Sequence, residues 1–185
     1  DLDMQLLDFE EVCKESVNQF EEMVQRKNLK ITIHAAPYDK DIYFDRLLLH
    51  QVVDNLVSNA VNYSEKDGHV ELSISYTEKE ILVTVKDDGI GIPKHQQGDI
   101  FTRFFRADNA RVHTADGSGL GLIFARSLVE GWRGRLWFES PIAWTNEKGE
   151  TRMAGSVFYF TVPYQCVDEK RCISYFITRD KKPAA

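Results

Sequence analysis

The chain has 185 residues, of which 43% are hydrophobic and 28% charged, a composition typical of one ordinary globular domain. Its formal net charge of −6 argues against a nucleic-acid backbone as the main partner, because binding to phosphates depends on clustered Lys and Arg. Its apolar runs are shorter than the roughly 18–20 residues needed to cross a bilayer, and Cys13, Cys166 and Cys172 lack the spacing of a zinc site or a disulfide framework, which favours reduced thiols.

The first half of the chain alternates between helical and extended patterns. Apolar spacing predicts an amphipathic helix over residues 9–27, and a short strand is predicted over 30–33. Asp45 is the expected N-cap of a second helix over 46–63, because its side chain can accept hydrogen bonds from the first turn. Two alternating strands follow at 69–77 and 81–87, and the short polar link between them predicts an antiparallel hairpin.

The second half begins with a long polar, glycine-bearing segment that extends to about residue 118. A helix is predicted over 120–132, stopped by Gly131 and Gly134, and strands are predicted over 135–140 and 156–162. This order of elements predicts an α/β protein, a two-layer sandwich whose helices cover one face of a mixed, mostly antiparallel sheet.

The predicted helix over 46–63 has two distinct stripes. One is apolar and should face the sheet: Leu49, Val53, Leu56 and Ala60. The other consists of four neutral amides: Gln51, Asn55, Asn59 and Asn62. The amide stripe allows two interpretations. It is either a solvated polar face or a row of donors and acceptors suited to a metal ion or to phosphate oxygens.

Two glycine clusters also allow two interpretations. DDGIGIP (87–93) follows a predicted strand, where Gly89 and Gly91 permit positive φ or a close approach. DGSGLGL (116–122) opens a predicted helix, and bare amides at a helix N-terminus form an anion site. Each cluster alone is consistent with an ordinary turn or cap, but both occur in one short chain together with the amide stripe.

Four segments together resemble a known family. NLVSNAVNY, DDGIGIP, FTRFFRAD and GSGLGL have the order and spacing of the N, G1, F and G2 boxes of sensor histidine kinases. The sequence therefore resembles their catalytic ATP-binding domain, a superfamily shared with gyrase, Hsp90 and MutL ATPase domains. The resemblance implies a catalytic domain over residues 1–163 with a mobile ATP lid at about 94–118. Residues 164–185 would be a C-terminal extension or tail.

The resemblance also implies a site for ATP and Mg²⁺. Asp87 would accept a hydrogen bond from the adenine amine, Asn55 would coordinate Mg²⁺, and Arg106 would approach the γ-phosphate; Asn55 and Arg106 are the expected catalytic residues. Gly89 and Gly91 would give the base room. The full set expected to bind the nucleotide is Asn55, Asn59, Asn62, Tyr63, Asp87, Gly89, Gly91, Ile92, Phe101, Arg106, Gly117, Ser118, Gly119, Leu120, Gly121, Leu122 and Ser156.

Two features depart from the family pattern. Asn62 stands where many members have a lysine that helps to neutralise the phosphates, and Lys66 or Arg103 could compensate. The stretch between Ser140 and Gly155 is longer than the usual hairpin before the last strand, and we expect it to be a tolerated surface insertion, because surface loops accept extra length at little cost.

The phosphoacceptor expected of such a kinase is missing, because none of the five histidines is followed by Asp: His34, His50, His69, His95 and His113. The resemblance thus implies transfer of the γ-phosphoryl group to a histidine on a separate dimerisation domain of the same full-length kinase, in two-component signalling that ends at a response regulator. The alternatives are an anti-sigma-type serine kinase and a non-catalytic ATP-sensing module. We expect a cytoplasmic, monomeric domain without nucleic-acid or membrane contacts, within a longer protein that a membrane anchor could hold.

Overall fold

A five-stranded sheet forms one layer of the molecule in the computed structural model, which describes residues 3–38, 41–114, 117–145 and 148–164. The strands are β2 (Lys30–Ala35), β4 (His69–Tyr76), β5 (Glu80–Asp87), β6 (Leu136–Glu139) and β9 (Ser156–Pro163). Their order is β2-β4-β5-β9-β6, and only the β2–β4 pair is parallel. The predicted mixed, mostly antiparallel sheet is confirmed, as is the β4–β5 hairpin.

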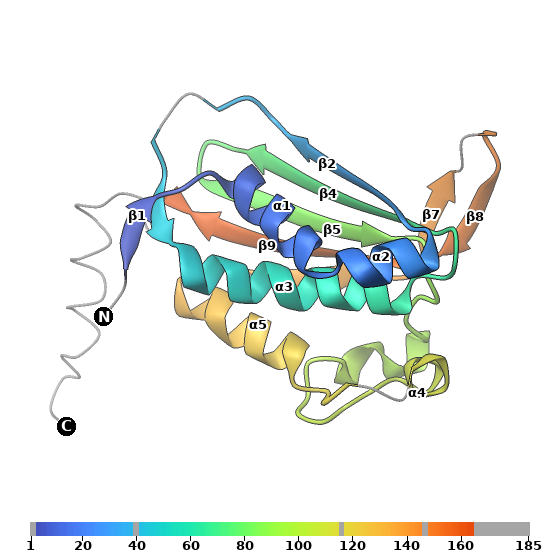
Figure 1. Cartoon of the computed structure of the whole chain (residues 1–185). Helices are drawn as coiled ribbons and strands as arrows, with labels where there is room; N and C mark the ends of the chain where they lie inside the picture. Colours follow the sequence, from blue (N-terminus) through green and yellow to red (C-terminus); the bar gives the residue numbers. More distant parts are fainter. Residues whose placement is uncertain (1–2, 39–40, 115–116, 146–147, 165–185) are drawn as a thin grey trace, which may run out of the picture.

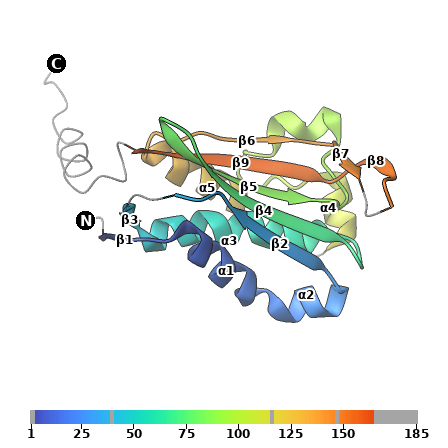
Figure 2. The same cartoon turned by 90° about the horizontal axis from the view of Figure 1, so that it is seen from above.

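Helices form the second layer on one face of this sheet (Figures 1 and 2). They are α1 (Phe9–Gln19), α2 (Glu21–Lys27), α3 (Arg46–Tyr63) and α5 (Gly121–Gly131). The predicted two-layer α/β sandwich is therefore confirmed. None of the described helices combines the length and apolar character needed to cross a membrane.

The helix α3 begins and ends where the sequence predicts. The Asp45 carboxylate accepts a hydrogen bond from the Leu48 amide at 3.1 Å, which caps the first turn. By contrast, the single helix predicted over 9–27 is wrong, because Phe20 (φ −104°, ψ 14°) separates α1 from α2. The side chain of Phe20 packs against the core, so tertiary contacts set a break that the apolar periodicity does not reveal.

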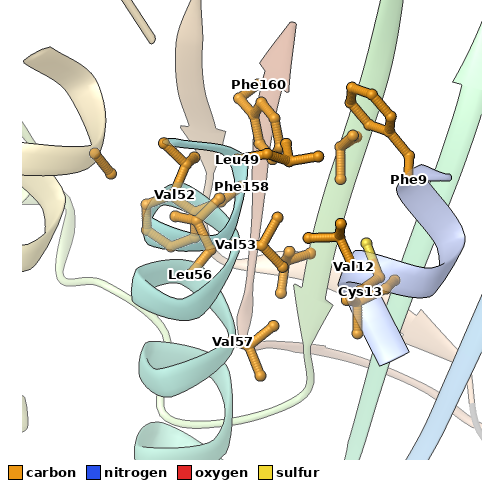
Figure 3. Packing of buried hydrophobic residues seen from close by; sticks show 14 of the residues in the cluster. Phe9, Val12, Cys13, Leu49, Val52, Val53, Leu56, Val57, Phe158 and Phe160 are labelled. Carbon is orange, nitrogen blue, oxygen red and sulfur yellow. The ribbon is translucent and has the colours of Figure 1, made fainter. Parts of the chain in front are cut away.

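The main core lies between α3, α1 and the sheet. The apolar stripe predicted on α3 is buried throughout, and Figure 3 shows Leu49, Val53 and Leu56 beside Phe158 and Phe160 of β9. Cys13 of α1 belongs to the same cluster, and burial raises the pKa of its thiol to about 12. Such a thiol is unreactive, in line with a purely structural role.

Several elements are present that the sequence did not predict. They are β1 (Met4–Leu6) paired with β3 (Tyr43–Asp45), a 3₁₀ helix (Lys94–Asp99), α4 (Asp108–His113), and the hairpin of β7 (Ile142–Thr145) and β8 (Thr151–Ala154). The 3₁₀ helix and α4 lie within the expected lid. Cys166, Cys172 and all but the first residue of the expected tail over 164–185 lie outside the described residues.

The β7–β8 hairpin occupies the stretch expected to be a surface insertion. It has a small hydrophobic cluster of its own, made by Ile142, Trp144 and Val157 with Tyr159 packed against them. Figure 1 shows the hairpin at the end of the sheet where β5 finishes and β9 begins. The insertion is thus a packed element, and it lies next to the residues that follow β5.

Candidate functional site

A cavity of about 270 Å³ lies between α3, the end of β5 and the segment that leads into α5. Its lining includes most of the residues expected from the sequence: Asn55, Asn59, Asn62, Tyr63, Asp87, Gly91, Ile92, Arg106, Gly117, Ser118, Gly119, Gly121, Leu122 and Ser156. Three expected residues, Gly89, Phe101 and Leu120, are not part of the lining, and neither is Gln51. The fold thus brings the helix, the strand end and both glycine clusters to one place.

The three residues outside the lining make other contacts. A Cβ on Gly89 would lie 2.2 Å from the Tyr63 carbonyl oxygen, so this glycine lets the loop pack on the end of α3 and does not give room to a ligand. Phe101 packs edge-on against Phe138, with ring centroids 6.0 Å apart. Leu120 is the N-cap residue of α5.

The amides of α3 are oriented by hydrogen bonds within the helix. Asn55 donates from Nδ2 to the Gln51 carbonyl at 2.6 Å, which turns its Oδ1 towards the N-terminus of α5. A Cβ on Gly121 would lie only 2.5 Å from this oxygen. Asn62 donates from Nδ2 to Ser58 Oγ at 3.1 Å. An oxygen is therefore presented at the point where α3 and α5 meet.

Asp87 is the last residue of β5 and is only 5% exposed. Burial raises the pKa of its carboxyl to about 7, and the nearby charge of Asp88 adds to the increase. Hydrogen bonds from the backbone amides of Gly89, at 3.0 Å, and Ser156 act in the opposite direction. A buried carboxyl with a strongly perturbed pKa on a cavity wall is typical of functional sites.

Ser140 links the segments around Asp87, and no pattern in the sequence predicted this role. Its hydroxyl oxygen accepts from the Ile92 amide at 2.8 Å and from Ser156 Oγ at 3.1 Å, and it donates to the Gly155 carbonyl at 2.8 Å. The Ser156 hydroxyl, expected near the ligand, is on the cavity wall but is bonded to Ser140. Only the folded structure brings these distant segments together.

Residues between 105 and 110 and between 117 and 119 form another side of the cavity. Gly119 has a φ of +69°, and its carbonyl accepts from the Phe104 amide at 3.1 Å. Arg106 donates from Nη2 to the Thr114 carbonyl at 2.6 Å and lies 3.4 Å from the position of a Cβ on Gly117. The guanidinium is therefore held against bare glycine backbone on the cavity wall. Together with the amides at the start of α5, it forms an environment for an anion.

Other lining residues were missed by the sequence reasoning: Ser58, Ile90, Ile100, Phe105, Ala107, Asn109, Ala110 and Phe158. Most are apolar or small, and no spacing distinguishes them from core residues. Asn109 of α4 donates from Nδ2 to the carbonyls of Gly91 at 2.9 Å and Ile90 at 3.3 Å. This contact joins α4 to the loop after β5, and its only sequence signal is its place directly after FTRFFRAD.

The cavity lining combines two kinds of chemistry. Asp87 supplies a hydrogen-bond acceptor, and Ile92 and Phe158 supply apolar surface, which together suit a flat ring with a donor at its edge. Asn55, Arg106 and the start of α5 also line the cavity, and they suit an anion. The described residues contain no cluster of three or more His, Cys, Asp or Glu that could hold a metal. The Asn55 oxygen fits Mg²⁺, which takes its other ligands from water and phosphate.

Comparisons with known proteins agree with this geometry. Residues 44–165 match the family model for histidine kinase-, DNA gyrase B-, and HSP90-like ATPases. The chain is 40% identical over 131 residues to the sensor histidine kinase WalK of Bacillus subtilis (strain 168), a match that covers 69% of this chain and 20% of WalK. The chain therefore spans about a fifth of the length of that relative.

Solved structures resemble the fold over most of the chain. The catalytic domain of the histidine kinase ThkA has a TM-score of 0.71 at 25% identity, and the match covers 88% of this chain and 99% of that domain. ThkA in complex with the response regulator protein TrrA has a TM-score of 0.67 at 25% identity, covering 87% of this chain and 42% of that one.

Proposed function

The chain belongs to the family of histidine kinase-, DNA gyrase B- and HSP90-like ATPases, and from this premise we propose that it binds Mg-ATP and donates the γ-phosphoryl group to a histidine on a separate domain. One observation carries the proposal: a single cavity is lined by the buried Asp87, by Asn55 where α3 meets the start of α5, and by Arg106 beside Gly117. This combination matches a nucleotide, which has both a base with a donor and anionic phosphates.

Asp87 is the proposed acceptor for the exocyclic amine of adenine. An ionised carboxylate can only accept hydrogen bonds, so it favours an amine over the carbonyl that guanine carries at the same position. Its burial places the bond in a medium of low polarity, where electrostatic interactions are stronger than in water. Ile92 and Phe158 on the same wall supply apolar surface for the ring.

The phosphates are proposed to lie between α3 and α5. Asn55 would hold Mg²⁺ through Oδ1, and the ion would neutralise charge on the phosphate oxygens. Arg106 and the amides of Gly119 and Gly121 would hold the phosphates in place. Most of the rate enhancement in phosphoryl transfer comes from positioning and charge stabilisation, which these groups can provide.

The proposed phosphate site has fewer positively charged residues than the family pattern. Asn62 occupies the lysine position, and neither Lys66 nor Arg103 is among the lining residues. Lys27 lies near the end of α3, but its Nζ donates to the carbonyls of Val61, Asn62 and Ser64 at 3.0, 2.6 and 2.8 Å. It stabilises the helix end, which leaves Arg106 as the principal cation of the proposed site.

The proposed partner is a histidine-bearing dimerisation domain of the same full-length kinase, with a response regulator as the indirect partner. ThkA has been solved with such a regulator. Within this chain His50 is a poor phosphoacceptor, because its Nε2 lies 2.7 Å from a Glu15 carboxylate oxygen and its Nδ1 lies 3.4 Å from Ser16 Oγ. These contacts indicate a structural histidine.

The proposal is tested in two steps. Calorimetric titration with ADP should give micromolar binding that requires Mg²⁺. For Asn55→Ala, adding Mg²⁺ should no longer bring about this binding. Gln51→Ala is the matched control, because Gln51 belongs to the same amide stripe but not to the cavity lining. Next, γ-labelled ATP and a helical histidine-bearing domain should yield an acid-labile phosphohistidine. Acid-stable label would indicate a serine kinase, and binding without transfer to any such domain would indicate an ATP-sensing module.

A further inference from the structure

Asp88, the residue after Asp87, is held by contacts with residues that do not line the cavity. Asp88 is 5% exposed, and its Oδ1 accepts from the His69 backbone amide at 2.8 Å. Its Oδ2 lies 3.2 Å from Nη2 of Arg152 and 3.5 Å from Nδ1 of His69. The same Arg152 nitrogen donates to the Asp88 backbone carbonyl at 3.2 Å. One guanidinium thus holds both the side chain and the backbone at the point where the chain leaves β5.

The β7–β8 hairpin holds Arg152 in this position. Arg152 of β8 pairs with Trp144 of β7, and Trp144 belongs to the small cluster with Ile142 and Val157. The ammonium of Lys86, one residue before Asp87, lies 4.3 Å from the centre of the Trp144 ring. The hairpin therefore contacts the end of β5 from both of its strands.

We propose that Arg152 is a positioning residue for nucleotide binding: from the hairpin it holds the carboxylate and carbonyl of Asp88, and it thereby fixes the strand end and balances the charge beside Asp87. The inference rests on the proposed function, because it takes Asp87 to be the adenine acceptor. It also gives a role to a stretch that is longer than the family pattern requires.

Arg152 is expected to affect Asp87 electrostatically because the carboxylates of Asp87 and Asp88 are adjacent. Burial is the main cause that raises the pKa of Asp87, and the charge of Asp88 raises it further; the guanidinium of Arg152 lies against that Asp88 charge. Without Arg152, the carboxyl of Asp87 would keep its proton to a higher pH and would be a poorer acceptor near neutrality. The variant substitutes none of the other charged or titratable groups around this strand end and cavity, which are His69, Lys86, Arg106, His113 and Glu65.

The test is the affinity for Mg-ADP measured by calorimetry between pH 6 and 9. Arg152→Ala should weaken binding about twofold to fivefold at pH 7, corresponding to a pKa change of about half a unit to one unit, and should recover to within about twofold by pH 9. Arg152→Lys, which keeps the charge, should lie between this variant and the wild type. The ionisation of the nucleotide's own phosphates is common to all variants, so the difference between the curves reports on the protein.

Arg135→Ala is the matched control, since Arg135 is an exposed arginine bonded to Glu80 at the other end of β5; its pH curve should coincide with that of the wild type. In an Asp88→Asn background, the effect of Arg152→Ala should disappear. A pH curve for Arg152→Ala that coincides with the wild type overturns the proposal. A curve that is weaker by the same factor at every pH supports the positioning of the strand end but contradicts the charge balance. Failure of the wild type to bind Mg-ADP at millimolar concentration overturns the proposed function instead.

Discussion

Asp87 combines two opposing properties in one side chain. The hydrogen-bond acceptor that an adenine amine needs is the ionised carboxylate, yet burial raises the pKa of this group to about 7 and so disfavours that charge. The backbone amides of Gly89 and Ser156 recover only part of the lost hydration. Binding and stability should therefore respond in opposite directions to a change at this residue.

The first prediction concerns Asp87→Asn. The amide keeps an acceptor for a backbone amide but carries no charge, so the free energy of unfolding at pH 8 should rise by about 1–2 kcal/mol. Affinity for ADP should fall at least about tenfold, because the amide also presents donors to the base. Urea denaturation and calorimetry measure the two effects. Undiminished ADP binding would contradict the assigned role.

Asp88→Asn is the matched control, because this neighbouring carboxylate is equally buried but is paired with Arg152. Asp88→Asn leaves the guanidinium of Arg152 without its carboxylate partner. The free energy of unfolding should therefore fall, in contrast to the rise expected for Asp87→Asn.

The second prediction is the pH dependence of stability without nucleotide. The pKa of Asp87 is raised from its ordinary value of 3.8 to about 7 in the folded protein. Below about pH 4 the carboxyl is protonated in both the folded and unfolded states, and its contribution to stability is fully present. As the pH rises from about 4 through about 7, only the unfolded state releases the proton, so this contribution is lost.

Urea denaturation of the wild type and of Asp87→Asn at several pH values isolates the effect of Asp87. The difference in unfolding free energy between the two proteins should change through this pH range and become constant above about pH 8. A difference that stays constant from pH 5 to pH 8 would show that the folded-state pKa of Asp87 is not raised.

At the scale of elements, local signals predicted α3, α5, the β4–β5 hairpin and the strands β2, β6 and β9, whereas long-range contacts decided the break at Phe20 and the elements that were not predicted. The cap at Asp45, the apolar periodicity and the polar link between the strands all lie within the segments that they specify. The break at Phe20 and the pairing of β1 with β3 depend on residues far away in the sequence. The strands β1 and β3 have only three residues each, too few for an alternating pattern. The apolar periodicity continues from α1 into α2, so it does not reveal the break at Phe20.

The third prediction concerns the contact between α3 and α5. Gly121→Ala would place a Cβ 2.5 Å from Asn55 Oδ1 and so displace the oxygen proposed to hold Mg²⁺. Mg-dependent binding of ADP should fall about tenfold, a loss of about 1.4 kcal/mol. Calorimetry with and without Mg²⁺ measures the change.

Gly131→Ala is the matched control at the other end of α5, where a new Cβ would meet nothing within 4 Å. Its binding should be unchanged, and its stability should rise by up to about 1 kcal/mol, because Ala is the better helix former. If Gly121→Ala also binds Mg-ADP as the wild type does, the close contact with Asn55 has no role in binding.

At the scale of the whole molecule, the site combines residues from α3, the end of β5, the segment before α5 and the start of β9. The sequence predicted many of these residues because the four motifs carry polar side chains and glycines in recognisable spacing. It did not predict Ser140, Asn109 or the apolar lining, because their roles arise from contacts between distant segments. The sequence also predicted that Gly89 gives the base room, whereas in the structure Gly89 packs against the end of α3.

The fourth prediction is that the chain on its own is a monomer. Leu47 on α3, Val112 on α4 and Met153 on β8 are exposed on separate elements, and single exposed apolar residues are common on monomer surfaces. Phe104, Leu120 and Phe124 are exposed near one another at the start of α5, beside the proposed nucleotide site. Sedimentation should give a single species of 21.3 kDa with or without Mg-ADP. A mass that doubles with concentration would contradict this and would point to a dimer contact within the domain itself.

Evolution can vary the β7–β8 hairpin without disturbing the rest of the domain, because Ile142, Trp144 and Val157 form a cluster separate from the main core. The hairpin itself lies outside the five-stranded sheet, yet it touches the residue next to Asp87 through Arg152. Selection could therefore adjust how readily such a domain fills with nucleotide by changing a peripheral element, while the four motifs stay fixed. Lineages that share every motif could differ in the cellular ATP level at which they become active.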